Sequence, residues 1–453
     1  MQSNFSGMRI IIAGAGEIGV YLAEMLAKEK HDVVLIEPNI DKLNAVESHH
    51  DILAIHGSST SFEILESAGA RHADLIIAVT QSEEVNLITS VFGKEMGAKQ
   101  SIARIDNKEF LQRKNEKYFR NLGIDSVICP ENLASNEIVG LLKQVGTTEV
   151  FEFSGGILSL LVIKQDEDSK IIGKTLIETD SLNPEFDFRA VAISRNNKTI
   201  IPKGDDVIQI NDFIYVITNQ EGIKIVLKYA GKEKFEIGNI MILGGSRIGK
   251  RTAKALEGHL KVKLIESDKE KCVELADQLK KTLVINGDGS DINLLMEEGI
   301  QNMDAFIAVT GNSETNIISC LIAKRLGVKR TIAEIENIHY IDLAENIGID
   351  TIINKKLIAA SKIFGYTMEA EVKSLKCLTG ADAEVMELVV HDNAKITKGL
   401  IKDIKFPKDA IIGGVVRGET SFIVKGNTQI LPGDKVVVFS LPGAIKKIQE
   451  YFN

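Results

Sequence analysis

Two stretches of the sequence share one pattern: MRIIIAGAGEIGVYLAEMLAKEKHDVVLIE (residues 8–37) and NIMILGGSRIGKRTAKALEGHLKVKLIE (residues 239–266). Each starts with an apolar run, turns at a cluster of glycines, continues as an amphipathic segment and ends at an acidic residue. This is the pattern of a βαβ unit whose glycine-rich turn, G-x-G-x-x-G, approaches a phosphate group. The first copy keeps all three glycines, whereas the second has Ser246 in the middle position. The sequence therefore predicts one fold twice, with two different pockets.

The similarity between the two halves continues well beyond the glycines, at an offset near 230 residues. ILAIHGSST matches TLVINGDGS, DLIIAVTQSEEVNLI matches DAFIAVTGNSETNII, SIARI matches TIAEI, and NLGIDSVICPENLAS matches NIGIDTIINKKLIAA. This period is far longer than the roughly 20 to 50 residues of solenoid repeats. It indicates duplication of a whole domain pair.

Short β-branched runs alternate with amphipathic segments in the first half, which is typical of parallel βαβ units. The predicted strands are residues 9–13, 33–36, 52–55, 75–79, 101–105 and 126–128. Six such strands fit the doubly wound order 3-2-1-4-5-6. After about residue 145, and again after about residue 384, the pattern changes to alternating strands, with turns predicted in the first such segment at Asn196-Asn197 and Gly204-Asp205. Arg195 in the first of these segments matches Arg417 in the second.

The predicted fold class is α/β: two Rossmann-like, doubly wound parallel-sheet domains, each followed by a small β-rich α+β domain. The boundaries are placed at 1–144, 145–230, 231–373 and 374–453, within the two to four domains that 453 residues suggest. The polar stretch at residues 228–238 is the predicted hinge between the halves, because it holds few apolar residues.

Composition excludes several classes of protein. A net charge of −9 and the absence of a basic, aromatic-bearing surface pattern argue against nucleic acid as a partner. The four cysteines are far apart, which argues against zinc and predicts buried thiols in a reducing compartment. No apolar run approaches the roughly 20 residues of a membrane helix, and MQSNFSG is not a signal segment. We expect a cytoplasmic chain that reaches a membrane only through a partner.

The first glycine turn has a chemical interpretation at each position. Gly14 allows the tight turn, Gly16 lets backbone amides approach a pyrophosphate, and Gly19 lets the helix pack on the strand. Glu37, at the end of the second strand, can accept hydrogen bonds from both ribose hydroxyls and would repel a 2′-phosphate. NAD(H) or a simple adenine nucleotide is therefore favoured over NADP(H). The alternative is a Rossmann-like fold that keeps its glycines for packing alone.

Ligands of such sheets lie across the carboxyl ends of the first and fourth strands. This places Thr80 and Gln81 beside the pyrophosphate and the second ribose, Arg104 further in, and Ser58 near the adenine. In the second half Asp288 replaces Ser58, Arg247 replaces Glu17, and Glu334 replaces Arg104. The charges of the two pockets are thus nearly exchanged, and Arg247 would suit a phosphate-rich ligand such as ATP or ADP.

No convincing acid or base for a reaction at the nicotinamide is present. His49, His50, His56 and His72 are interpreted as surface histidines around the adenine side. The acid pairs Glu83-Glu84 and Asp205-Asp206 are interpreted as loop charges, with a metal or second-ligand site as the alternative. No catalytic and no metal-binding residues are predicted, and the nucleotide is expected to act as an effector.

GAGEIG with Glu37, the HGSST and NGDGS turns, and the IAVT segments followed by Asn86 and Asn316 resemble the RCK (KTN) regulators of potassium transport. The resemblance covers nearly the whole chain and implies lobes that bind NAD(H) or ATP/ADP. It also implies a homo-oligomer, four chains forming a ring of eight such lobes, on a membrane subunit of the TrkH type that forms the ion pathway. Carried onto this sequence, the nucleotide-lining residues are Gly14, Ala15, Gly16, Glu17, Ile18, Gly19, Glu37, Thr80, Gln81, Arg104, Gly244, Gly245, Ser246, Arg247, Ile248, Glu266, Thr310, Gly311 and Glu334.

Two other functions remain open on the sequence alone. One is an NAD-dependent oxidoreductase with tandem Rossmann domains, in which the β-rich segments would act as substrate lids. The other is a soluble metabolite sensor that contacts another protein without any role in transport.

Overall fold

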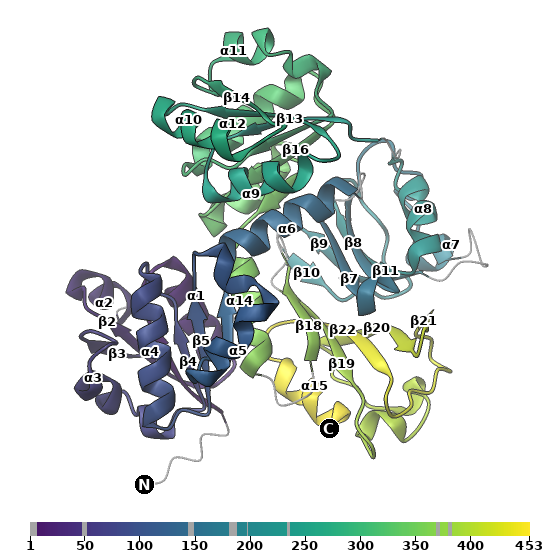
Figure 1. The fold of residues 1–453 in the computed structure, drawn as a ribbon. Helices are drawn as coiled ribbons and strands as arrows, with labels where there is room; N and C mark the ends of the chain where they lie inside the picture. Colours follow the sequence, from purple (N-terminus) through teal and green to yellow (C-terminus); the bar gives the residue numbers. More distant parts are fainter. Residues whose placement is uncertain are drawn as a thin grey trace. The chain divides into compact units, whose positions relative to one another are not determined.

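The computed structural model describes residues 7–47, 52–143, 149–180, 188–196, 198–232, 236–367, 372–378 and 383–453 (Figure 1). Of the positions singled out in the sequence, His49, His50, Asn197 and residues 233–235 of the predicted hinge lie outside these ranges. Within them, no helix has both the length and the apolar character that crossing a bilayer requires.

The first half opens with a six-stranded parallel sheet in the order β3-β2-β1-β4-β5-β6. Its strands are β1 (Arg9–Ala13), β2 (Asp32–Glu37), β3 (Leu53–His56), β4 (Leu75–Ala78), β5 (Gln100–Arg104) and β6 (Ser126–Ile128). Its helices are α1 (Glu17–Lys28), α2 (Ile40–Glu47), α3 (Phe62–Ser67), α4 (Glu83–Met96) and α5 (Arg113–Asn121), with the 3-10 turns η1 (Ala70–His72) and η2 (Lys108–Leu111). The predicted strand order is confirmed, and the strand ends differ from the prediction by one residue at most.

The central strand β1 explains why this sheet forms as it does. Ile10, Ile11 and Ile12 are fully buried, so successive side chains on both faces of the strand are covered. A strand buried on both faces must be apolar at every position, which is why the RIIIA run does not alternate. Helix α4 is capped by Ser82, the residue before its first turn, whose hydroxyl accepts from the backbone N–H of Val85.

The second half repeats this lobe, with the strand order β14-β13-β12-β15-β16-β17. Its strands are β12 (Asn239–Leu243), β13 (Lys261–Glu266), β14 (Leu283–Asn286), β15 (Ala305–Ala308), β16 (Arg330–Glu334) and β17 (Thr351–Ile353). Its helices are α9 (Arg247–Leu256), α10 (Lys269–Gln278), α11 (Ile292–Glu297), α12 (Ser313–Arg325) and α13 (Ile341–Asn346), with η4 (Ile300–Asn302) and η5 (Ile338–Tyr340). The duplication of the parallel-sheet domain is confirmed.

Each parallel-sheet lobe is followed by a five-stranded antiparallel sheet, in the orders β10-β9-β11-β8-β7 and β18-β19-β22-β20-β21. The first lobe of this kind holds β7 (Glu149–Phe153), η3 (Ser154–Gly156), β8 (Leu158–Lys164), α7 (Leu176–Asp180), β9 (Phe188–Arg195), β10 (Lys198–Ile200), β11 (Phe213–Thr218) and α8 (Gln220–Tyr229). The second holds β18 (Val372–Cys377), β19 (Glu384–Val389), η7 (Lys395–Thr397), η8 (Ile401–Asp403), β20 (Ala410–Arg417), β21 (Thr420–Ile423), β22 (Lys435–Ser440) and α15 (Ile445–Phe452). The predicted β-rich companions are therefore confirmed.

The matched arginines of the two antiparallel lobes make the same contact. Arg195 donates from Nε and from a terminal nitrogen to the two carboxylate oxygens of Asp212, at 2.8 and 2.7 Å. Arg417 does the same to Asp434, at 2.8 and 2.7 Å. Both aspartates are buried, so the charge-assisted fork fixes the start of the last strand of each lobe. The sequence match between these arginines thus reflects a shared structural contact.

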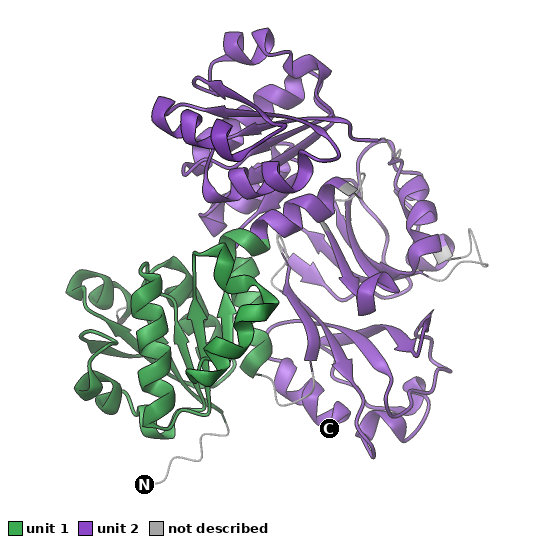
Figure 2. Cartoon of the chain, in the orientation of Figure 1, with its two compact units in different colours: residues 1–133, 356–369 green, residues 134–355, 370–453 purple. Residues whose placement is uncertain are grey.

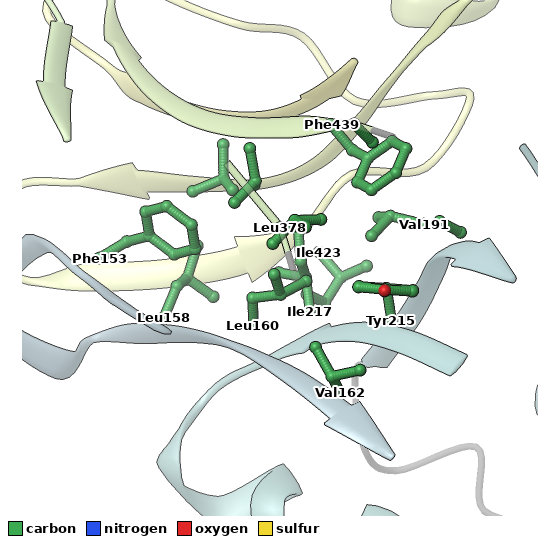
Figure 3. Packing of buried hydrophobic residues seen from close by; sticks show 14 of the residues in the cluster. Phe153, Leu158, Leu160, Val162, Val191, Tyr215, Ile217, Leu378, Ile423 and Phe439 are labelled. Atoms are coloured by element: carbon green, nitrogen blue, oxygen red, sulfur yellow. The ribbon is translucent and has the colours of Figure 1, made fainter. Parts of the chain in front are cut away.

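The two antiparallel sheets share one hydrophobic core (Figure 3). Leu160, Tyr215 and Ile217 come from the first sheet, and Leu378 and Phe439 come from the second antiparallel lobe. The rings of Tyr215 and Phe439 have centroids 6.1 Å apart. Because both partners in this packing lie within one chain, the duplicated lobes stabilise each other.

The chain forms two compact units (Figure 2). One combines Met1–Leu133 with Lys356–Glu369, so helix α14 (Lys355–Phe364) and η6 (Gly365–Thr367) of the second half belong mainly with the first parallel sheet. The Ser126 and Tyr366 hydroxyls are 2.6 Å apart there. In the other unit, Ser135 of α6 (Pro130–Lys143) accepts from the Thr252 hydroxyl of α9 at 3.2 Å. Each parallel-sheet lobe thus packs against a helix from the other half, which the repeat alone did not predict; the four lobe boundaries stay predictions.

Candidate functional site

Two glycines of the first turn are required by backbone packing. Gly14 has φ +107°, and a Cβ there would lie 3.0 Å from the Thr80 backbone. A Cβ on Gly19 would lie 1.9 Å from the carbonyl oxygen of Gly14. Both positions therefore tolerate only glycine, because a larger residue would push helix α1 away from the ends of β1 and β4.

Gly16 differs, because no contact in the described part of the chain requires glycine there. Its backbone is extended, with φ −76° and ψ 178°, and an added Cβ would meet no atom of the described residues within 4 Å. As the N-cap of α1 it also lacks a side chain that could accept from the first-turn N–H groups. Open space beside uncapped helix N–H groups is what an approaching anion needs.

Glu37 lies next to this turn and is already engaged in holding it. The carboxylate is buried, and its two oxygens accept from the backbone N–H of Ala15 at 2.7 Å and of Asn39 at 3.0 Å. The acid thus connects the end of β2 to the glycine turn. It lies where the sequence expected a ribose-binding group, with its position fixed by two backbone donors.

A buried asparagine joins the ends of β4 and β5 beside the turn. The Asn86 side-chain oxygen accepts from the N–H and the hydroxyl of Thr80, both at 2.7 Å. Its amide nitrogen donates to the carbonyls of Thr80 and Arg104, at 3.1 and 3.0 Å. This clamp places Thr80, Gln81 and Arg104 at one edge of the sheet, and Gln81 is exposed there.

Arg104 is directed toward acidic groups of its own lobe. One terminal guanidinium nitrogen lies 3.2 Å from Glu131, at the start of α6, and 3.6 Å from Asp106. The side chain is only 18% exposed, so these carboxylates compensate much of the buried charge.

We call the residues around the turn at 14–19 the first pocket and those around the turn at 244–249 the second pocket. The second pocket reproduces the framework of the first. Gly244 has φ +103°, and a Cβ on Gly249 would lie 2.0 Å from the Gly244 carbonyl. Asn316 accepts from the N–H and hydroxyl of Thr310, at 3.0 and 2.6 Å, and donates to the carbonyls of Thr310 and Glu334. Gly311 directly follows Thr310 and is exposed, as Gln81 is after Thr80 in the first pocket.

The acid of the second pocket has an additional partner. Glu266 accepts from the N–H of Gly245 at 2.9 Å and of Asp268 at 3.0 Å, as Glu37 does from its own turn. In addition, the Lys271 ammonium lies 2.7 Å from its carboxylate. Burial alone would raise the pKa of Glu266, but the hydrogen bonds, with that of Lys271 foremost, bring it below its usual value. The Glu266 carboxylate therefore has a cationic partner in addition to its two backbone donors.

Ser246 acts as a helix cap. It is the N-cap of α9, and its hydroxyl accepts from the N–H of Gly249 at 3.2 Å. Its φ of −57° and ψ of 170° lie close to those of Gly16, so the two turns follow the same path. The serine oxygen therefore occupies the capping position that Gly16 leaves open for an anion.

The opposite charges at the innermost position are also present in the structure. Glu334 is buried at the end of β16, with the Lys355 ammonium 3.6 Å from its carboxylate. Lys355 also pairs with Glu336. Where the first pocket has an arginine facing acids, the second has an acid facing a lysine.

The remaining predicted positions take simpler roles. The Ser58 hydroxyl contacts that of Thr60 at 2.8 Å, and Asp288 accepts from the N–H and hydroxyl of Ser290. His56 and His72 are exposed, as predicted. The acid pairs are used locally: Glu83 accepts from two backbone N–H groups beyond β5, and Asp206 accepts from that of Lys203. The four cysteines are buried, and none of them is in a disulfide. In the described ranges, no cluster of three His, Cys, Asp or Glu side chains is placed to hold a metal ion.

Two lysines near the pockets were not predicted. Lys271 follows Glu266 by five residues, and Lys42 follows Glu37 at the same spacing in the first half. Lys42 is exposed on its helix, so the shared spacing alone gave no reason to select Lys271. Lys356 lies on α14, and its ammonium is 2.9 Å from the carboxylate of Glu17 in the first turn. The only sequence signal was the KK pair at 355–356 where the first half has Pro130-Glu131.

A pair of Rossmann-type lobes with duplicated glycine turns, each joined to an antiparallel companion, defines a tandem two-lobe class of protein, and comparisons with known proteins agree. The family model described as the TrkA-N domain matches residues 10–130 and 240–355, and the TrkA-C domain matches residues 160–231 and 385–453. The chain belongs to the TrkA family of Trk system potassium uptake proteins. The resemblance to the RCK (KTN) regulators is thereby confirmed.

Two relatives show how far the similarity extends. The Trk system potassium uptake protein TrkA of Haemophilus influenzae is 35% identical over 437 residues, covering 95% of each chain. A Trk system potassium uptake protein TrkA homolog of Archaeoglobus fulgidus is 35% identical over 446 residues, covering 98% of this chain and 100% of the relative. The similarity is therefore to whole proteins of this family.

Solved structures confirm the fold. The GsuK RCK domain superposes with a TM-score of 0.61 at 17% identity, covering 100% of this chain and 96% of that one. The GsuK channel bound to NAD has a TM-score of 0.60 at 17% identity, with coverage of 100% and 80%. GsuK bound to ADP has a TM-score of 0.51 at 16% identity, with coverage of 80% and 69%.

Proposed function

We propose that this chain is the nucleotide-responsive regulatory subunit of a membrane potassium uptake system. The observation that carries this proposal is full-length similarity, at 35% identity, to Trk system potassium uptake proteins. The membrane partner is a transporter subunit of the TrkH type, and the chain binds it at the inner face of the cell membrane. In this proposal the chain catalyses no reaction, and its nucleotide is an effector.

A strain that lacks the chain tests this role. Rubidium uptake, measured as a potassium substitute, should fall several-fold when the chain is deleted and recover when the full chain is returned. Unchanged uptake in the deletion strain, with other uptake systems silenced, would argue for the metabolite-sensor alternative. Steady consumption of NADH with a small carbonyl compound would support the oxidoreductase alternative instead.

The first pocket is the proposed site for NAD(H) or for ATP and ADP. The glycine turn Gly14 to Gly19, Glu37, Thr80, Gln81 and Arg104 surround one edge of the sheet, and Gly16 leaves space at the helix N–H groups. The structural relatives named for their NAD and ADP complexes support this choice of ligands. On binding, the ribose hydroxyls would donate to the remaining lone pairs of the Glu37 oxygens, while the two backbone donors keep the carboxylate in place.

The second pocket is proposed to bind nucleotide more weakly and by a different geometry. Ser246 already caps α9, and Lys271 already neutralises Glu266. Its lining would be Gly244, Gly245, Ser246, Arg247, Ile248, Glu266, Thr310, Gly311 and Glu334. Arg247 is its one added cation relative to the first turn, and this favours ligands rich in phosphate.

Calorimetric titration separates the two pockets. NADH, NAD, ATP and ADP are titrated into the wild type and into Glu37→Ala and Glu266→Ala. We expect Glu37→Ala to remove the tighter binding event and Glu266→Ala to leave it in place. If neither substitution changes any affinity, the site assignment is wrong.

Family membership also supports a proposal about assembly. We propose a tetramer forming a ring of eight parallel-sheet lobes, so that nucleotide-dependent changes in several lobes act together on the transporter. Light scattering of the purified chain should give about four times the 49.6 kDa chain mass. A monomer at all concentrations would contradict the ring.

A further inference from the structure

The second half of the chain contributes a buried cation to the first glycine turn. Lys356 lies on α14, and its ammonium is 2.9 Å from Oε2 of Glu17, the first residue of α1. The Lys356 side chain is 11% exposed, whereas that of Glu17 is 56% exposed. The lysine is thus fixed by its surroundings, and the glutamate can move into solvent.

This placement puts a positive charge beside the uncapped end of a helix. Glu17 directly follows Gly16, where an added Cβ would meet open space. The N–H groups of the first turn of α1 already favour an anion, and a buried ammonium requires a negative partner. In the structure described, the Glu17 carboxylate supplies that negative charge.

A diphosphate would be a stronger partner than Glu17. It brings more negative charge and more acceptor oxygens than one carboxylate, and it can accept from helix N–H groups and from an ammonium at the same time. Because Glu17 is more than half exposed, its release into solvent costs little.

The residues that the repeat matches to Lys356 and Glu17 carry the opposite charges. Glu131 stands on α6 where α14 has Lys356, and Arg247 stands on α9 where α1 has Glu17. The carboxylate at the Lys356 position cannot bind a phosphate directly. The added lysine is therefore a property of the first pocket.

We propose that Lys356 is a phosphate-binding residue of the first pocket, paired with Glu17 in the absence of nucleotide and transferred to the diphosphate on binding. This inference rests on the proposed nucleotide-binding function. Since Lys356 belongs to the second half, the exchange of partners links occupancy of the first pocket to the second half through α14.

The test compares phosphorylated and unphosphorylated ligands by calorimetry on the full chain. ADP, NAD and adenosine are titrated into the wild type, Lys356→Met, Lys356→Arg and Glu17→Gln, with Lys362→Met as the control for an exposed lysine of the same helix. Lys356→Met should weaken the binding of ADP and NAD about ten-fold or more, which is the contribution expected of one charge-assisted hydrogen bond. Adenosine should bind the wild type and Lys356→Met equally. Lys356→Arg should keep most of the affinity, and Lys362→Met should keep all of it.

The direction in which Glu17→Gln changes the ADP affinity is decisive. Removing the competing carboxylate should tighten ADP binding, whereas a purely structural ion pair would make Glu17→Gln and Lys356→Met equally harmful. Equal ADP affinity of the wild type and folded Lys356→Met would overturn the inference while leaving nucleotide binding intact. Absence of ADP and NAD binding in the wild type would overturn the proposed nucleotide function itself. If Lys356→Met does not fold, as judged by its melting temperature, the sign of the Glu17→Gln effect decides alone.

Discussion

At the scale of single residues, Gly16 and Ser246 show how one side chain can change a pocket without changing the fold. Their backbone angles nearly coincide, and both are followed by a helix whose third residue is a glycine packed on the turn. At this one position the difference is the capping oxygen of Ser246. The same backbone therefore offers bare N–H groups in one half and a satisfied donor in the other.

Exchanging these two residues should exchange this property. Gly16→Ser should leave the unfolding free energy unchanged or raise it by a few tenths of a kcal/mol, because serine is a slightly better N-cap than glycine. The same change should weaken ADP and NAD binding about ten-fold or more, because the hydroxyl takes the place of a phosphate oxygen. Melting curves and calorimetry measure the two effects, and Ser246→Gly is the matched control. Tighter binding to Gly16→Ser would contradict this account.

The buried asparagines make a prediction about stability. Asn86→Ala removes hydrogen bonds to four backbone and hydroxyl groups around Thr80 and Arg104 and should cost about 3 kcal/mol of unfolding free energy. Asn316→Ala should cost a similar amount, because its contacts are the same. Urea denaturation measures both. A loss of unfolding free energy below about 1 kcal/mol would show that water replaces the hydrogen bonds of the asparagine.

At the scale of elements, the strands could be predicted closely, but the packing partners of the helices could not. The all-apolar run of β1 and the glycines around Gly14 determine a parallel sheet with a turn above it, and the strand order followed from that pattern. The partner of α14 could not be predicted, because an amphipathic helix shows which face it buries but not against what. The same limit hid Lys356 and Lys271, whose importance depends on the carboxylate that each faces. Ser246 was recognised as different, but its role as a cap needed the structure.

The contacts at the C-terminal end of helix α9 predict how stability depends on pH. Glu257 is buried beside this end, where it pairs with Lys254 and accepts from the N–H groups of Lys281 and Thr282. Burial opposes the charge, but these partners lower the pKa of Glu257 from 4.5 to about 2. A folded-state pKa below the unfolded value means that the stabilisation is complete above pH 4.5 and is lost as the pH falls toward 2.

The expected size of this effect is about 3 kcal/mol, since each pKa unit corresponds to about 1.4 kcal/mol. Denaturation at a series of pH values should show the wild type losing this contribution relative to Glu257→Gln. Parallel pH profiles for the two proteins would show that the carboxylate contributes nothing specific.

The shared core of the antiparallel lobes predicts that they unfold together. Phe439→Ala removes a fully buried ring that packs against Tyr215 of the other lobe and should cost about 3 to 5 kcal/mol. Hydrogen exchange should then accelerate in strands of both antiparallel sheets. Faster exchange confined to β18–β22 would mean that the first of these lobes is stable alone.

At the scale of the whole molecule, duplication followed by divergence suits a regulator. Two lobes with the same frame and different electrostatics can respond to different ligands, or to one ligand at different concentrations. A ligand shifts a conformational equilibrium only by the difference between its affinities for the two states. Under the proposed function, a strict pocket and an altered pocket in one chain would provide two separate inputs to one membrane partner.

The most direct test of this account is nucleotide-dependent rubidium uptake by proteoliposomes that contain the transporter subunit and this chain. With the wild type, uptake should change several-fold on addition of NADH, NAD, ATP or ADP, while the nucleotide is recovered unchanged. Glu266→Ala should retain a response, and Glu37→Ala should lose the response that depends on the first pocket. Equal responses from folded wild type and Glu37→Ala would contradict the account.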